Sequence, residues 1–171
     1  IAYANGYAQW EAVKQLNFTF NVERGGNIVA ARSWSWKPHS GEVTMASSND
    51  TLSYNRASID STVQAADRGF INDKFWLLAP YQLIWDEGTT ITTVENVPSP
   101  IGGTPLKKLT ITYGNDGGYT PGDAYDFYYG NDYLVKEWVF RKGNVEEPSM
   151  ITTFDEYRTY NGITVATSHT N

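Results

Sequence analysis

Hydrophobic and polar residues alternate along the first third of the chain. In residues 15–22 every second position is apolar, and Gly25-Gly26-Asn27 then supplies a turn. A period of two is typical of strands with one buried face, and a glycine-rich turn between two such runs predicts a hairpin. Two shorter runs follow near residues 42–47 and 51–54, so we expect a four-stranded meander. The second strand, residues 28–36, places on one face Ile28, Ala30, Arg32, Trp34 and Trp36.

Two other segments have apolar residues at the spacing of a helix. Residues 3–14 carry an aromatic stripe at intervals of three to four, which predicts a short amphipathic helix weakened by Gly6. From Asp60 to Pro80 a helical period is interrupted at Asn72-Asp73, so we expect two helices at about 61–70 and 73–79. The second is apolar around most of its circumference, which predicts burial.

The second half of the chain is rich in strand-forming residues after a loop at 96–105 with three prolines and two glycines. The segment Tyr119–Gly143 is the most aromatic, and neither of its two strands keeps a polar face, so we expect a hairpin covered on both sides. Strands are predicted near residues 106–113, 123–130, 132–142, 150–158 and 162–169.

This order of elements predicts an α+β fold. We expect a single domain spanning residues 1–171, with one large antiparallel sheet of about nine or ten strands and helices on one face. A sheet that wide must curl, which gives a half-barrel wrapped over the helices. A gap between helices and concave sheet would form an apolar cavity.

Composition narrows the class of protein. The 171 residues carry a net charge of −6, which argues against nucleic acid or an anionic membrane as the main partner. The chain has 12 Tyr, 7 Phe and 6 Trp, which suit pockets and interfaces, and it has no cysteine, so neither disulfides nor thiolate sites are available.

The element order resembles the half-barrel lipoprotein carriers of the cell envelope, the group of LolA, LolB, LppX and LprG. Three phrases also look like uncharacterised envelope lipoproteins of similar length: RSWSW at 32–36, INDKFWLLAP at 71–80 and YTPGD at 119–123. The resemblance implies a pocket for an apolar ligand such as an acyl chain, with no catalysis and no cofactor. It also implies a periplasmic, outer-membrane, surface or secreted location and leaves open a protein partner in the envelope.

Candidate chemistry is sparse. The common nucleophile, zinc and nucleotide motifs do not occur, and the two histidines, His39 and His169, fit surface positions. Four aspartates crowd the aromatic hairpin and could hold calcium, although tight turns require the same residue types. They are Asp116, Asp123, Asp126 and Asp132. Asn17-Phe18-Thr19 and Asn49-Asp50-Thr51 match the glycosylation sequence, which matters only in a eukaryotic secretory pathway.

We therefore expect a non-catalytic protein that binds a lipid or another hydrophobic small molecule, with no metal. Arg32 would either brace the edge of the core by stacking on an indole or meet an anionic head group at the pocket mouth. The helical run at 75–78 would either line the cavity or fill it. The alternatives are an accessory subunit that binds a protein partner and an unrecognised hydrolase. The predicted ligand-binding residues are Arg32, Trp34, Trp36, Phe75, Trp76, Tyr125, Phe127 and Trp138.

Overall fold

The computed structural model describes residues 1–48 and 50–171 and has a mixed α+β fold with antiparallel sheets. Asn49 of the second glycosylation sequence lies outside the described residues. The chain divides into two compact units. We call Trp10–Trp76 the four-stranded unit, and Ile1–Gln9 together with Leu77–Asn171 the five-stranded unit. Each is described by itself.

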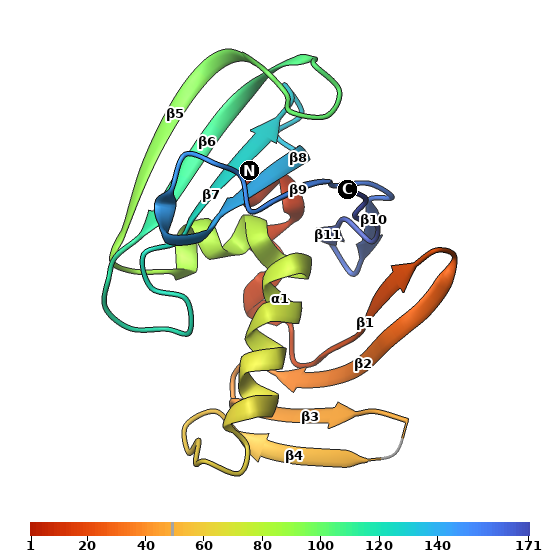
Figure 1. Ribbon diagram of the computed structural model, residues 1–171. Helices are drawn as coiled ribbons and strands as arrows, with labels where there is room; N and C mark the ends of the chain where they lie inside the picture. The colour runs from red at the N-terminus through yellow and green to blue at the C-terminus, as the bar shows by residue number, and fades with distance from the viewer. Residues whose placement is uncertain (49) are drawn as a thin grey trace. The chain divides into compact units, whose positions relative to one another are not determined.

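The four-stranded unit contains the predicted meander (Figure 1). Its strands are β1 (Leu16–Arg24), β2 (Asn27–Lys37), β3 (Glu42–Ala46) and β4 (Thr51–Asn55), each antiparallel to the next. Trp36 lies opposite Leu16 on one side and Val43 on the other, and Trp34 lies opposite Phe18 and Met45. The alternation predicted from the sequence is confirmed, because one face of this sheet carries the apolar row and Trp34 and Trp36 are buried.

The helical segment α1 (Gln64–Trp85) covers most of the region where two helices were expected, and its kink lies at Leu78. The predicted break at Asn72-Asp73 was wrong, since Asp73 is a buried partner of the sheet and does not end the helix. The one non-helical residue is Leu78, with φ −117° and ψ 24°, two positions before Pro80. Proline removes a backbone donor and crowds the preceding turn, which explains the distortion there.

The helix expected at 3–14 is confirmed only in part. The segment forms two 3₁₀ helices, η1 (Tyr3–Asn5) and η2 (Tyr7–Ala12), separated by Gly6 at φ 87°. A Cβ on Gly6 would lie 1.9 Å from the carbonyl oxygen of Gly162, so only glycine fits. The aromatic spacing predicted a helix, and this close backbone approach prevents a continuous one.

The five-stranded unit contains β5 (Thr89–Pro98), β6 (Pro105–Tyr113), β7 (Ala124–Tyr129), β8 (Val135–Arg141) and β9 (Met150–Thr153) in sequential order. A short helix, η3 (Lys142–Asn144), follows β8, and β10 (Arg158–Tyr160) pairs with β11 (Ile163–Val165). Strand β5 was not predicted from the sequence. The prediction of one continuous sheet was wrong, since the described strands form three sheets. The predicted half-barrel is not confirmed, because none of these sheets is strongly curled.

The aromatic hairpin β7–β8 is covered on both faces, as its sequence predicted. On one face Tyr125 stacks on Phe140 and Trp138, with ring centroids 5.0 and 5.2 Å apart, and Phe127 is fully buried. On the other face the buried residues include Asp126 and Glu137. The hairpin is therefore the centre of its unit's core.

Candidate functional site

Asp73 joins helix α1 to the sheet of the four-stranded unit. Its carboxylate has no exposed surface and accepts two hydrogen bonds from Arg32, Nε to Oδ2 at 2.7 Å and Nη2 to Oδ1 at 2.6 Å. The indole Nε1 of Trp34 donates to Oδ2 at 2.8 Å, and Asn72 Nδ2 donates to Oδ1 at 3.1 Å. The hydrogen bond to Asp73 holds the pKa of Arg32 above its ordinary value. A bidentate pair of this kind fixes orientation as well as charge.

A second buried carboxylate lies six residues earlier on the same helix. Asp67 Oδ1 accepts from Arg56 Nε at 2.8 Å and from the hydroxyl of Tyr54 at 3.2 Å. Its side chain is also fully buried. Two ion pairs, one at each end of the contact, therefore hold residues 67–73 of the helix on the sheet.

Between the two ion pairs lies an aromatic layer centred on Phe70. Its ring meets those of Trp34 and Trp36 edge to face, each with centroids 5.5 Å apart. The ammonium group of Lys74 lies 5.4 Å from the centroid of the Trp36 ring. These contacts close the space beneath the helix, so both tryptophans belong to the core of the unit.

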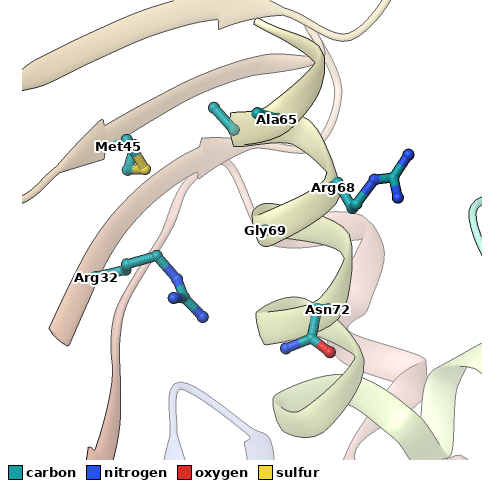
Figure 2. A pocket seen from close by; sticks show the side chains of 7 residues that line it. Arg32, Met45, Ala65, Arg68, Gly69 and Asn72 are labelled. Carbon is teal, nitrogen blue, oxygen red and sulfur yellow. The ribbon is translucent and has the colours of Figure 1, made fainter. Parts of the chain in front are cut away.

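A groove remains open beside this core, with a volume of about 430 Å³. Figure 2 shows Arg32 reaching toward the helix from β2, Met45 on β3, and Arg68 and Asn72 extending from the helix. The remaining lining residues are small: Ala65, Ala66 and Gly69. The groove thus has an apolar floor, and two arginines, Arg32 from β2 and Arg68 from the helix, contribute to its lining.

Gly69 is unusual because glycine in a helix interior costs about 0.5–1 kcal/mol relative to alanine. A Cβ at this position would meet Trp34 at 3.7 Å and Arg32 at 4.0 Å, which are ordinary contacts. Packing therefore does not require glycine here. The missing side chain leaves room in the groove.

Arg32 packs on a different aromatic ring from the one predicted. Its guanidinium carbon lies 5.4 Å from the centroid of Phe20, its neighbour across β1, and not over an indole as predicted. The two bonds to Asp73 use Nε and Nη2, so Nη1 lies outside that pair. Arg32 braces the core and also lines the groove.

The other predicted ligand-binding residues fall into three environments. Trp34 and Trp36 are buried, and Phe75 and Trp76 are half-buried, with Trp76 6.4 Å from Phe20 between ring centroids. A separate cluster in the five-stranded unit brings together Tyr125, Phe127 and Trp138.

Sequence reasoning missed most of the groove. Apart from Arg32, its lining was not predicted, namely Met45, Ala65, Ala66, Arg68, Gly69 and Asn72. The available signal was a run of small residues on a helix that otherwise packs aromatics.

Three of the four aspartates of the aromatic hairpin make contacts with nearby residues of the same unit. Asp123 accepts from the backbone N–H of Gly143, and Asp126 pairs with Arg141 Nε at 3.0 Å. Asp132 accepts from the N–H of Leu134 and pairs with Lys136. Within residues 1–48 and 50–171, no group of three or more acidic or histidine side chains could hold a metal ion.

The histidines contact backbone carbonyl groups. His39 Nε2 lies 3.1 Å from the carbonyl oxygen of Glu11, and His169 Nδ1 lies 3.1 Å from that of Thr153. The His169 ring packs edge to face on Phe154. Neither contact places a histidine between a carboxylate and a nucleophile, so they give the hydrolase alternative no support.

Comparisons with family models, curated proteins and solved structures found no match to this chain. In the part of the chain that the structure describes, no helix is long and apolar enough to cross a membrane.

Proposed function

We propose that this protein binds an amphipathic ligand without chemical change, with the ligand's apolar chain in the groove between α1 and the strands β2 and β3. The observation that carries the proposal is the combination of an apolar floor with two arginines in its lining. A volume of about 430 Å³ lies in the range of small-molecule sites.

The charge at the groove selects the ligand class. Arg32 and Arg68 line it, while the Asp73 carboxylate that neutralises Arg32 is fully buried. A guanidinium at the edge of an apolar surface suits a carboxylate or phosphate head group, because its planar donors match those oxygens. The ligand we propose is therefore an anionic lipid, such as a fatty acid or a lysophospholipid.

We extend the proposal to architecture and location. Four antiparallel strands, a long helix and five more antiparallel strands follow the element order of the half-barrel lipoprotein carriers. We accordingly propose a lipid carrier of the cell envelope, or a secreted equivalent, that acts like the half-barrel lipoprotein carriers and has protein partners in the envelope. The support is the element order together with the groove.

The test fills the groove with a side chain at position 69. Gly69→Leu places an isobutyl group above the floor, and Gln64→Leu adds the same residue at an exposed position of α1 that does not line the groove. Binding of a fluorescent fatty acid is measured by titration, and bound mass by native mass spectrometry. We expect Gly69→Leu to weaken binding at least tenfold and Gln64→Leu to leave it unchanged, with both proteins folded by circular dichroism.

Two outcomes contradict the proposal. One is a wild-type chain that takes up neither fatty acid nor lysophospholipid. The other is equal binding by the wild type and Gly69→Leu. A fatty alcohol of the same chain length separates the charge contribution, since Arg68→Gln should weaken binding of the acid and not of the alcohol.

A further inference from the structure

Strand β5 forms one edge of the five-stranded sheet, and β6 is its sheet neighbour among the described strands (Figure 1). Long edge strands with free backbone groups recruit other strands, so proteins usually blunt them with charge, proline or bulges. In β5 the bulge and the proline lie only in the C-terminal half of the strand. The register shifts between Val94 and Val97, Asn96 has φ 58°, and Pro98 ends the strand.

The register shows which residues face outward. The N–H of Gly114 donates to the carbonyl of Gly88, and this pair continues the register in which Thr90 lies opposite Thr112. Hydrogen-bonded pairs alternate in an antiparallel ladder, so Thr90 and Thr92 bond to β6. The N–H and C=O groups that face outward therefore belong to Thr89, Ile91 and Thr93.

This outer edge is suited to pair with a copy of itself. The segment from Thr89 to Val94 carries no charged residue, so two identical copies do not repel each other there. Ile91 is 44% exposed and stands at the middle of the three outward residues, opposite the buried Ile111 of β6. An antiparallel pairing centred on Ile91 brings the same residue of both copies together.

We propose that the protein forms a two-fold symmetric dimer through β5. Ile91 pairs with Ile91 of the partner copy, and Thr89 pairs with Thr93 of the partner copy, each pair exchanging two backbone hydrogen bonds. The two isoleucines then cover each other and extend the apolar row of Ile111 across the symmetry axis. The closed symmetry uses both outer edges and stops at a dimer.

Mass measurement over a range of concentrations tests the oligomeric state. Light scattering coupled to gel filtration should give twice the mass of the chain at high concentration. Ile91→Lys places like charges on the axis and should shift the protein to monomer, whereas Thr92→Lys, on the opposite face of the same strand, should retain the dimer. A wild-type monomer at every concentration overturns the proposal, as does an open-ended series of larger oligomers.

The pairing register is tested by a single introduced thiol, because the chain has no cysteine. Directly opposed residues of a hydrogen-bonded antiparallel pair have Cα atoms about 5.5 Å apart, within disulfide range. Ile91→Cys should therefore give a disulfide-linked dimer on mild oxidation, and Thr93→Cys should not, since it faces Thr89 of the partner copy. Equal cross-linking of both variants overturns the proposed register. The variant Gly69→Leu, which tests ligand binding, should leave the dimer intact. The dimer proposal can therefore fail or hold independently of the proposed ligand binding.

Discussion

Asp73 has no contact with water, and its two oxygens accept from three side chains on β2 and α1. Its charge balances Arg32, which is about one third exposed. Removing one partner of a buried pair leaves the other without compensation, and this costs more than the pair contributes.

Asp73→Asn is expected to lower the free energy of unfolding by about 2–3 kcal/mol. The amide removes the charge and turns a donor toward the guanidinium, although the exposed part of Arg32 can regain water, which limits the loss. Urea denaturation measures the change, and Glu23→Gln on the exposed end of β1 is the control. A loss no larger than that of Glu23→Gln would refute the role of Asp73.

His169 makes stability depend on pH. Burial lowers its pKa below the ordinary value of 6.5, while the hydrogen bond to the Thr153 carbonyl and the charge of Asp155 raise it by less. The unfolded chain therefore binds this proton first. Stability from neutral His169 is present above pH 6.5 and is lost as the pH falls through the folded-state pKa.

We expect the melting temperature to fall between pH 7.5 and pH 5.0 by a larger amount for the wild type than for His169→Gln. The glutamine retains a donor for the Thr153 carbonyl but does not titrate. Its fall in melting temperature therefore reports all the other groups, and the difference from the wild type isolates His169. Thermal unfolding followed by circular dichroism gives both differences. Identical falls would mean that His169 is not held neutral in the fold.

At the scale of elements, Glu137 of β8 holds the loop between β5 and β6. It is 7% exposed. Its Oε1 accepts from the Ser99 hydroxyl at 2.8 Å and the Gly102 N–H at 2.9 Å, and its Oε2 accepts from the Ile101 N–H at 2.7 Å. A carboxylate with several such donors anchors the loop without a cation.

Glu137→Gln should release this loop, because one amide position donates and cannot accept from a backbone N–H. Hydrogen exchange at Ile101 and Gly102 is expected to accelerate at least tenfold while exchange in the strand interiors stays the same. Glu95→Gln, an exposed change in β5, is the control. Unchanged protection at both amides would show that Glu137 does not stabilise the loop.

The strands β1–β4 follow from sequence because alternation is a local signal, and β7–β8 follow because their aromatic and β-branched residues favour strands. β5 escaped prediction because it is exposed on both faces, so its apolar residues keep no clear period. The helix boundary failed for a different reason. Asp73 was taken as a break, but its partner Arg32 lies 41 positions away, and no local pattern reveals such a pair.

The same distinction applies to the candidate site. Arg32 was predicted because it shares a strand face with two tryptophans. Gly69 and Met45 meet it only after the helix packs on the sheet, so their role depends on the fold. Trp34 and Trp36 were expected in the pocket and instead form the core beneath the groove, because Phe70 packs against both.

At the scale of the whole molecule, net charge sets two opposite salt dependences. Each copy carries −6, so the proposed dimer must overcome repulsion that salt screens, with a Debye length falling from about 10 Å at 0.1 M to about 3 Å at 1 M. Ligand binding by arginines should instead weaken with salt.

We expect the dimer dissociation constant to fall several-fold between 0.05 and 0.5 M NaCl, measured by analytical ultracentrifugation. Fatty acid affinity should fall over the same range, and fatty alcohol affinity should not. A dimer that weakens with salt would indicate a charged interface elsewhere on the chain.

The division of the chain also bears on the order in which the protein is assembled during synthesis. The four-stranded unit is one uninterrupted segment, whereas the five-stranded unit combines Ile1–Gln9 with residues that begin at Leu77. The carbonyl of Asn5 accepts from Tyr81, and Gly6 approaches Gly162. During synthesis the segment Ile1–Gln9 must therefore wait until Tyr81 and Gly162 have left the ribosome, while strands β1–β4 and the helix that covers them can fold in between.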